Sequence, residues 1–284
     1  MDPDALKRDN VSGASEILRD AGRALLEHLD SGTPQSLQRF GLELIRSQPR
    51  MAPLFNLVNA ALLASGDAAS EVRVFLEQHE RAENAVLAQA EPLILDAQCI
   101  GIYSRSSTVI RALLRARQRG GRFRIFVTES RPMREGNRAA EELARAGVAV
   151  TLAVDAAMRQ LVNDSDLILL GADAISATSW TNKIGSAALA SLARAAASPL
   201  WILTTTQKFI PDRIRLPGEA DHARDEVWPQ APDNIKVANR YFESVSIRAA
   251  SGVIAETGVL DPAALHRLEN EVEIATPLLR EFSS

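Results

Sequence analysis

The chain has 284 residues, of which 46% are hydrophobic and 24% are charged, and its formal net charge is −4. This length suits one or two domains with a large core, and the acidic balance gives no support for a nucleic-acid-binding protein. The N-terminus is polar, and no apolar run approaches the roughly 20 residues of a membrane span. The single cysteine, Cys99, excludes an internal disulfide. We therefore expect a cytoplasmic protein without nucleic-acid or membrane partners.

The first third of the chain predicts helices and no strand, because its apolar residues recur at helical spacing. Thr33 is expected to cap a helix that begins at Pro34. A longer helix is expected over residues 67–89, and Pro92 is expected to limit it. Residues 1–93 are therefore expected to form an N-terminal helical domain.

From residue 94 onward, strands and helices alternate. The expected strands cover residues 99–103, 123–127, 148–154, 167–170 and 200–203. Strands that alternate with helices predict an α/β fold with a doubly wound, mostly parallel sheet and helices on both faces. Residues 94–284 are expected to form this domain and to contain the ligand site. Within it, the polar segment 213–234 predicts a long surface loop.

Polar residues are concentrated directly after four of the expected strands. They form the segments 104–108, 128–132, 171–173 and 204–208. In open parallel sheets, ligands bind outside the carboxyl ends of the strands. The sequence therefore predicts a site for a phosphate or a sugar phosphate at that edge of the sheet.

Two polar segments are expected to open helices and to offer groups that bind phosphate. Residues 104–108 combine hydroxyls, free backbone N–H groups and Arg105, although serine and threonine there also suit simple helix capping. Residues 181–186 supply Lys183 as a point charge and small residues that permit close approach of a ligand. The alternative for Lys183 is the solvated state that is usual for a lysine.

Asp173 follows a fully apolar strand, so its carboxyl group is expected to be partly desolvated. Desolvation raises the pKa of a carboxyl group and suits acid–base work, although a lone aspartate more commonly caps a turn. Cys99 lies at the start of its strand and is expected to be a core residue. Trp180 fits either a lid over the site or a packing residue.

No metal and no cofactor are expected. The four histidines lack the spacing of metal ligands, and a lone thiol cannot build a zinc cluster. Neither a P-loop nor a dinucleotide-binding fingerprint occurs, so nucleoside triphosphate hydrolysis and nicotinamide chemistry have no support.

Several segments resemble, in order and spacing, one known family. They are residues 103–109, 128–132, 171–175, 182–186, 241–243 and 254–259. The family holds the alpha, beta and delta subunits of eukaryotic translation initiation factor 2B, together with methylthioribose-1-phosphate isomerase and ribose-1,5-bisphosphate isomerase. The resemblance covers roughly residues 10–260. It implies an N-terminal helical domain, a Rossmann-like domain and a homodimer formed through the latter.

The isomerases of this family use a cysteine and an aspartate, while Arg, Asn and Lys hold the phosphorylated sugar. The resemblance places the aspartate at Asp173 and the Asn-Lys pair at Asn182 and Lys183. The position of the cysteine falls on Ile102, which has no proton to give. Cys99 lies three residues upstream, on the opposite face of the strand, so it cannot substitute.

Other positions also depart from the isomerase pattern. Ser104 is the hydroxyl nearest to the lost thiol, but its pKa is far above that of a thiol. The family's N-terminal Arg-Gly-Ala corresponds to residues 12–14, which read Ser-Gly-Ala, and its Arg-Pro corresponds to residues 48–49, which read Gln-Pro. Arg50 stands beside the latter and is expected to compensate. Residues 103–105 look instead like those of the initiation-factor subunits, which are not isomerases.

The sequence therefore predicts first a translation initiation factor 2B-like protein that binds a sugar phosphate or a nucleoside monophosphate in a regulatory or assembly role. The alternative is an aldose–ketose isomerase of the ribose-1,5-bisphosphate or methylthioribose-1-phosphate type, which is an intramolecular oxidoreductase. A second alternative is a structural dimer with a vestigial pocket. The candidate catalytic residues are Asp173 and Ser104. The candidate ligand-binding residues are Arg50, Arg105, Ser106, Arg131, Asn182 and Lys183.

Overall fold

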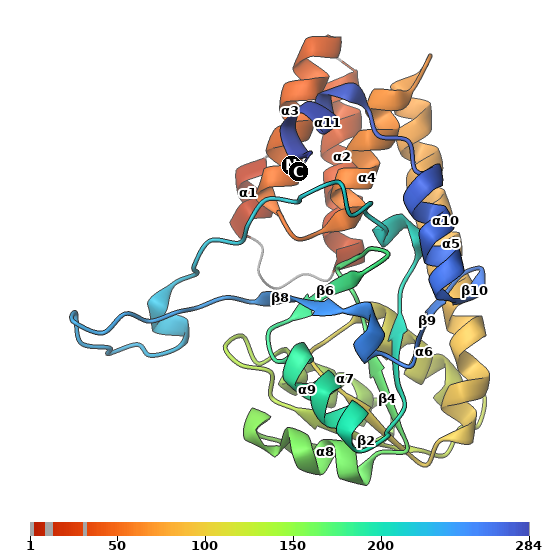
Figure 1. The fold of residues 1–284 in the computed structure, drawn as a ribbon, viewed down its shortest axis with the longest axis vertical. Helices are drawn as coiled ribbons and strands as arrows, with labels where there is room; N and C mark the ends of the chain where they lie inside the picture. The colour runs from red at the N-terminus through yellow and green to blue at the C-terminus, as the bar shows by residue number, and fades with distance from the viewer. Residues whose placement is uncertain (1–2, 9–13, 31–32, 284) are drawn as a thin grey trace.

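The computed structural model describes residues 3–8, 14–30 and 33–283. The helices before the first strand are α1 (Pro3–Arg8), α2 (Ala14–Leu29), α3 (Pro34–Ser47), α4 (Ala52–Leu63) and α5 (Ala68–Asp96). They form a bundle above the sheet region (Figure 1, red to orange). The long helix α5 belongs to both regions, because Val72 lies in the core of the bundle and Ile94 in a core of the sheet.

The start of α3 is fixed by a capping box. The Thr33 hydroxyl accepts a hydrogen bond from the backbone N–H of Ser36 at 3.2 Å, and the Ser36 hydroxyl accepts one from the N–H of Thr33 at 2.8 Å. Pro34 follows at the first helical position, where the missing N–H has no helical partner to lose. The predicted Thr33 cap is confirmed.

The helix limit predicted at Pro92 is wrong, because α5 continues through this residue to Asp96. A proline removes one helical hydrogen bond, here the bond to the carbonyl of Ala88. Pro92 and Ala88 are both exposed, so water can satisfy that carbonyl. Ala90 and Ile94 are buried on the other side of the helix and hold it against the sheet.

The main sheet has seven strands within the described residues, in the order β10-β9-β7-β4-β1-β2-β3. They are β1 (Cys99–Ile102), β2 (Arg124–Thr128), β3 (Ala149–Ala153), β4 (Leu167–Leu170), β7 (Leu200–Leu203), β9 (Gly252–Ala255) and β10 (Gly258–Leu260). Neighbouring strands are parallel except β9 and β10. The strand order reverses between β1 and β4, which pair with each other. The predicted mostly parallel sheet is confirmed.

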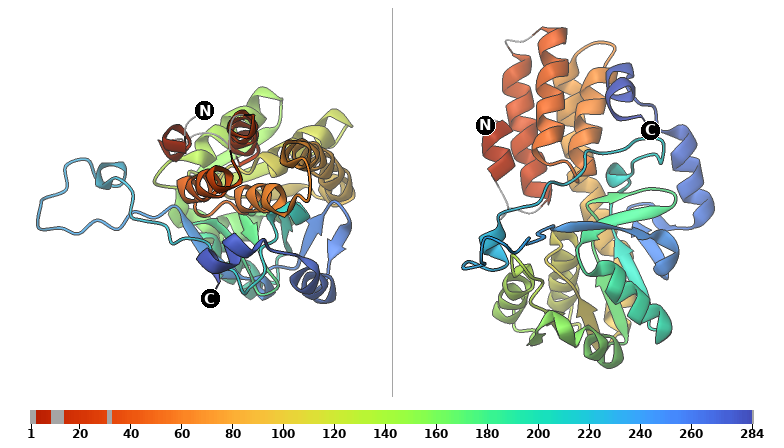
Figure 2. Two further views of the ribbon diagram at one scale, coloured as in Figure 1. Left: turned by 90° about the horizontal axis from the view of Figure 1, so that it is seen from above. Right: turned by 60° about the vertical axis from the view of Figure 1, so that its left-hand side comes forward.

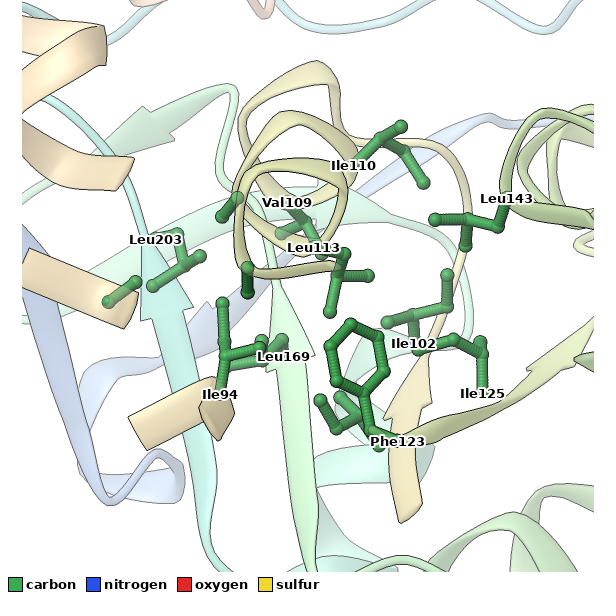
Figure 3. Packing of buried hydrophobic residues seen from close by; sticks show 14 of the residues in the cluster. Ile94, Ile102, Val109, Ile110, Leu113, Phe123, Ile125, Leu143, Leu169 and Leu203 are labelled. Carbon is green, nitrogen blue, oxygen red and sulfur yellow. The ribbon is translucent and has the colours of Figure 1, made fainter. Parts of the chain in front are cut away.

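Helices cover both faces of this sheet (Figure 1). The connecting helices are α6 (Ser107–Gln118), α7 (Glu135–Arg145), α8 (Met158–Asp164) and α9 (Ser186–Ala195). On one face, Ile102 and Leu169 pack with Leu113 of α6 and Leu143 of α7 (Figure 3). On the other face, Ile168 belongs to a second core with α8 and α9. Successive strand residues alternate between two cores, so the sheet is doubly wound, as predicted.

A smaller antiparallel sheet stands beside the main one, in the order β5-β6-β8. Its strands are β5 (Ala174–Ile175), β6 (Ser179–Lys183) and β8 (Phe242–Ser246). The prediction that residues 181–186 open a helix is therefore corrected: Asn182 and Lys183 pair with β8, a partner distant in the sequence. Helix α9 begins only after Gly185, whose φ of +101° suits glycine. Trp180 is a buried packing residue of β6 rather than a lid.

The C-terminal helices α10 (Pro262–Glu271) and α11 (Thr276–Phe282) bring the end of the chain back to the helical region (Figure 2, dark blue). The rings of Phe282 in α11 and Phe55 in α4 meet edge to face, with centroids 5.7 Å apart. The core of the helical region therefore includes side chains from the end of the chain. The division into residues 1–93 and 94–284 stays a prediction.

The segment 213–234, predicted as a surface loop, begins against the body, where Ile214 is buried in the core of the helical region, and its later part extends as a long excursion (Figures 1 and 2, light blue). It contains the short 3-10 helix η3 (Arg224–Glu226) and otherwise has irregular backbone. Exposed apolar side chains lie on and beside this excursion, including Trp228 and Ile235. In the part of the chain that the structure describes, no helix combines the length and apolar character needed to cross a membrane.

Replacing Gly136 with alanine is expected to lower the free energy of unfolding by about 1–3 kcal/mol. A Cβ at Gly136 would lie 1.7 Å from the carbonyl oxygen of Thr128, so the start of α7 would have to move away from the end of β2. Gly66→Ala is the control, since a Cβ there meets nothing within 4 Å. Urea unfolding measures both variants, and equal stabilities would contradict this packing argument.

Candidate functional site

A cavity of about 520 Å³ lies between the helical region and the carboxyl ends of β1 and β4. Open α/β sheets bind ligands where the strand order reverses, and β1 and β4 form that point here. The walls come from the α3–α4 connection, the turns after β1 and β4, the end of β6, the 3-10 helix η2 (Thr206–Lys208) and residues 217–222. This volume falls within the roughly 300–1,000 Å³ of small-molecule sites.

The structure brings together most of the residues that the sequence singled out. The cavity is lined by Arg50, Ser104, Arg105, Ser106, Asp173, Asn182 and Lys183. Arg131 lies apart from them and does not line the cavity. Its guanidinium donates instead to the carbonyl oxygens of Glu226, at 3.3 Å, and Val227, at 3.0 Å. Arg131 therefore ties the η3 part of the excursion to the turn after β2.

The turn after β1 is braced by the turn after β2. Ser104 has a left-handed backbone, with φ of +61°, and its N–H donates to the Ser130 hydroxyl at 2.8 Å. The Asp155 carboxylate in turn accepts hydrogen bonds from the N–H groups of Ser130, at 2.8 Å, and Arg131, at 2.7 Å. The position of Ser104 at the cavity thus depends on a carboxylate that follows β3.

Ser106 is both a helix cap and a part of the cavity wall. Its hydroxyl accepts a hydrogen bond from the N–H of Val109 at 3.4 Å, which confirms the capping role. A Cβ at Gly171 would come within 2.3 Å of this hydroxyl, so only glycine lets the turns after β1 and β4 approach so closely. Arg105 is paired with Glu142 of α7, with Nη2 2.9 Å from the carboxylate.

Lys183 is buried, so the alternative expectation of a solvated lysine is wrong. Its side chain is 3% exposed, and its Nζ lies 2.7 Å from Oε1 of Glu135. The same Nζ lies 5.0 Å from the centre of the Tyr241 ring. The other carboxylate oxygen of Glu135 is buried without a hydrogen-bond partner among the described residues, so it can accept a donor from a ligand.

Asn182 lies next to Lys183 and is fixed by the start of α9. Its Nδ2 donates to the Ser186 hydroxyl at 2.9 Å, and that hydroxyl donates to the Lys183 carbonyl at 2.6 Å. Both side chains therefore take their place from the strand-to-helix turn at Gly185. A rigid turn of this kind can hold the amide and the ammonium group toward one ligand.

Asp173 is fixed by backbone hydrogen bonds on both sides. Its N–H donates to the Thr181 carbonyl at 2.9 Å, and its carbonyl accepts from the N–H of Ala52 at 3.1 Å. Burial raises the pKa of the Asp173 carboxyl group to about 6, against the opposing effect of the positive charge of Lys208. A carboxyl group with this pKa can accept and return a proton near neutral pH.

Lys208 is a functional candidate that the sequence analysis missed. Its side chain is almost fully buried, and its Nζ donates to the carbonyl of Ala172 at 2.8 Å. Lys208 lies in the polar run 204–208, which was placed at the correct edge of the sheet, but nothing in that run distinguished the lysine from its neighbours. A second buried ammonium group strengthens the case for an anionic ligand.

Residues 217–222 and 241–242 form a further wall that the sequence analysis did not assign. Glu219 accepts hydrogen bonds from the N–H groups of Tyr241, at 2.9 Å, and Phe242, at 3.1 Å. The His222 ring stacks on Tyr241, with ring centres 3.6 Å apart. Tyr241 belongs to the family-like segment 241–243, which could have pointed to it. Glu219 and His222 lie in the polar segment 213–234, whose sequence does not distinguish them from their neighbours.

Arg50 lines the cavity, and its Nε is buried without a hydrogen-bond partner among the described residues. This donor is available to a ligand. Ala14 also lines the cavity, whereas Ser12 and Gly13 lie outside the described residues. No group of three or more His, Cys, Asp or Glu side chains suited to a metal occurs in the described ranges.

No thiol reaches this cavity. Cys99, the chain's only cysteine, is buried at the start of β1 in the core shared with α8 and α9. Ile102 is buried in the opposite core, under α6. The two side chains therefore lie on opposite faces of the sheet, as the strand periodicity predicts.

A model of the Initiation factor 2 subunit family matches residues 10–262. Ribose 1,5-bisphosphate isomerase of Archaeoglobus fulgidus is 29% identical over 269 residues, which are 89% of this chain and 86% of that protein. A putative translation initiation factor eIF-2B subunit 2-like protein of Pyrococcus horikoshii is 28% identical over 264 residues, which are 90% and 94% of the two chains. Relatives with either name thus match about equally well.

Solved structures agree with this likeness. The structure of translation initiation factor eIF-2B from Pyrococcus horikoshii has a TM-score of 0.83 at 26% identity and covers 93% of this chain and 97% of that chain. The structure of 5-methylthioribose 1-phosphate isomerase from the same organism has a TM-score of 0.71 at 20% identity, with coverage of 94% and 86%. The latter bears on the fold alone.

Replacing Asp173 with asparagine is expected to stabilise the protein at neutral pH. Because the pKa of this carboxyl group is raised in the folded state, ionising it costs folding free energy as pH rises from about 4 to about 6. The variant avoids this cost, so its gain is expected to appear over that pH range and to level off on the order of 2 kcal/mol. Thermal unfolding at several pH values measures it.

Asp225→Asn is the control for this experiment, because Asp225 is an exposed carboxylate on the excursion. Its stability is expected to follow that of the unmodified protein at each pH. A gain for Asp173→Asn that is absent at neutral pH, or that is the same at all pH values, would contradict the assignment of a raised pKa to Asp173.

Proposed function

The chain belongs to the Initiation factor 2 subunit family, and we propose that it binds a sugar phosphate or a nucleoside monophosphate in the cavity between the helical region and the sheet. In this proposal it acts in the cytoplasm as a translation initiation factor 2B-like protein, in a regulatory or assembly role. The bound ligand is held without being isomerised.

The observation that carries this proposal is the convergence of two buried ammonium groups on one cavity. Lys183 and Lys208 are almost fully buried, and a buried lysine is rare unless it is paired or serves a ligand. The free Nε of Arg50 and the amide of Asn182 add donors to the same cavity. Together they suit a phosphate, while Asp173 suits a ribose hydroxyl.

The absence of isomerisation follows from the residue at the end of β1. An aldose–ketose isomerisation moves a proton between two carbons and therefore needs groups that donate and accept protons on the substrate. Ile102 has no such group, and it is buried in the sheet core. The Ser104 hydroxyl is not a ready substitute, because its pKa is far above that of a thiol.

The second candidate function is a sugar-phosphate isomerase, which one observation favours. The pKa of Asp173, raised by burial to about 6, suits a group that takes and returns a proton. Relatives named ribose 1,5-bisphosphate isomerase match most of the chain. In this case Asp173 would be the catalytic base, with Ser104 or a water as the second proton donor.

A thermal-shift screen tests the proposal with ribose 1-phosphate, ribose 1,5-bisphosphate, methylthioribose 1-phosphate, AMP and GMP. At least one is expected to raise the melting temperature, since a ligand at a hundred times its Kd adds about 2.7 kcal/mol of stability. Lys183→Gln is expected to lose the shift, because its amide can still bond to Glu135 but carries no charge for a phosphate. Lys236→Gln, at an exposed lysine just after the excursion, is the matched control and should retain the shift.

The same ligands are then assayed for aldose–ketose turnover. Binding without turnover supports the proposed function. Turnover that disappears in Asp173→Asn while binding persists would establish the isomerase instead. A screen in which no ligand shifts the melting temperature would leave the structural dimer with a vestigial pocket.

We further propose that the protein is a homodimer formed through the α/β region. The edge strand β3 and the segment following it expose Leu152 and Val154, and the excursion exposes Val227 and Trp228. Arg131 and Asp155 connect these two places, since Asp155 binds the N–H of Arg131 and Arg131 binds the carbonyl of Val227. A second copy that covers both would remove a large apolar area from water.

Trp228→Ser is expected to shift the protein toward the monomer in light scattering coupled to gel filtration, because it removes the largest exposed apolar side chain of this surface. Val259→Ser is the control, since Val259 is 60% exposed on β10, at the opposite edge of the sheet. A monomeric unmodified protein, or a Trp228→Ser variant that associates as before, would contradict this interface.

A further inference from the structure

A buried polar network lies behind the cavity without lining it. Its members are Ser15 of α2, His79 and Glu83 of α5, Thr108 and Arg111 of α6, and Gln207 of η2. The network nevertheless touches the cavity walls, because Ser15, Thr108 and Gln207 are chain neighbours of residues that line the cavity. Nothing in the proposed function uses its buried histidine and glutamate.

Glu83 is the centre of this network. Its Oε1 accepts hydrogen bonds from the hydroxyls of Ser15, at 2.6 Å, and Thr108, at 3.5 Å. Its Oε2 accepts one from Nη1 of Arg111, at 2.7 Å. The Ser15 hydroxyl also lies 3.4 Å from Nε2 of His79. These contacts tie Ser15 of α2 and Arg111 of α6 to Glu83, beside the ring of His79 on the same helix α5.

The other ring nitrogen of His79 reaches into the sheet region. Nδ1 lies 2.7 Å from Oε1 of Gln207, and since a carbonyl oxygen only accepts, Nδ1 carries the proton. Gln207 also donates through Nε2 to the Phe75 carbonyl at 3.0 Å, and its own carbonyl accepts from Nδ2 of Asn56 at 2.7 Å. The helical region thus holds Gln207 by its side chain and by its backbone.

Gln207 immediately precedes Lys208, the second buried ammonium group of the cavity. Both belong to η2, a single turn of three residues, which is also tied by Asn56 of α4 to the Gln207 carbonyl and by Glu256 to the N–H of Thr206. Lys208 reaches the Ala172 carbonyl at 2.8 Å from this turn, and its charge acts on Asp173. The place of the ammonium group therefore depends on what holds Gln207.

We propose that His79 is a positioning residue of the ligand site, which acts through Gln207 on Lys208 without touching the ligand. The expected effect on affinity for a phosphorylated ligand rests on the proposed function. The expected effect on the position of Lys208 does not, and it can be tested without any ligand. Loss of the Nδ1 donor removes the hydrogen-bond partner of Oε1 of the partly buried Gln207, which favours a shift of η2 and of Lys208 with it.

The test compares variants that keep or lose the donor. His79→Leu removes it, whereas His79→Asn keeps an N–H group close to the place of Nδ1. Asn59→Leu is the matched structural control: Asn59 joins α4 to the C-terminal segment by two hydrogen bonds of 2.8 Å, with the carbonyl of Glu273 and the N–H of Ala275, away from the cavity. Gln207→Met tests the same link from its other end.

The first measurement is the rate at which acetic anhydride labels Lys208, read by peptide mass spectrometry relative to the exposed Lys236. His79→Leu and Gln207→Met are each expected to raise the rate about fivefold or more, as for a side chain released by local opening. His79→Asn and Asn59→Leu are expected to keep the rate of the unmodified protein. If one of His79→Leu and Gln207→Met does not fold, the other alone tests the inference.

The second measurement is the Kd for ribose 1,5-bisphosphate by calorimetry, below the melting temperature of every variant. His79→Leu is expected to weaken binding about tenfold, the effect of one buried hydrogen bond, and His79→Asn to restore it within about twofold. Asn59→Leu is expected to lower the melting temperature with an unchanged Kd.

An unchanged labelling rate of Lys208 in His79→Leu or Gln207→Met would overturn the inference. An equal rise of this rate in Asn59→Leu would also overturn it, because it would indicate a general loss of stability. If labelling follows the expected pattern while the unmodified protein does not bind ribose 1,5-bisphosphate, the positioning of Lys208 stands and the ligand proposal fails for that compound. The two proposals are thereby separated.

Discussion

The close approach of β1 and β4 at their carboxyl ends is the constraint on which the site depends. Gly171 has no side chain, and the space beside it is taken by Ser106, which caps α6. The turns after the two strands therefore meet, so that Ser104 and Asp173 face one cavity although some 70 residues separate them in the chain. A side chain at residue 171 would push these turns apart and divide the site.

Several charged side chains are buried around the cavity, and each lies near a group of opposite charge. Lys183 is paired with Glu135, and the charge of Lys208 opposes the effect of burial on Asp173. Buried pairs of this kind contribute little to stability compared with apolar packing. Their presence in one place supports our proposal that the cavity binds an anion.

The helical region does more than cover the sheet. It supplies Arg50 to the cavity wall, and its His79 and Asn56 bond to Gln207 in the short turn that carries Lys208. Long helix α5 makes this possible, because it is packed in the core of the bundle at one end and in a core of the sheet at the other. The two regions thus form the cavity together, with Asp173 in its wall and Ile102 buried in the sheet core.

The sequence by itself determined the five parallel strands β1, β2, β3, β4 and β7 with the helices between them, the cap at Thr33, and the edge of the sheet where the cavity lies. These features follow from local periodicity and from residue types next to each strand, which a single sequence contains. Only the tertiary structure decided that Lys183 ends a strand instead of opening a helix, that Arg131 turns to the excursion, and that Pro92 lies within a helix. It also decided that Lys208 lies in the cavity. Each of these depends on the pairing, packing or exposure of segments far apart in the chain, and local pattern carries no record of such contacts.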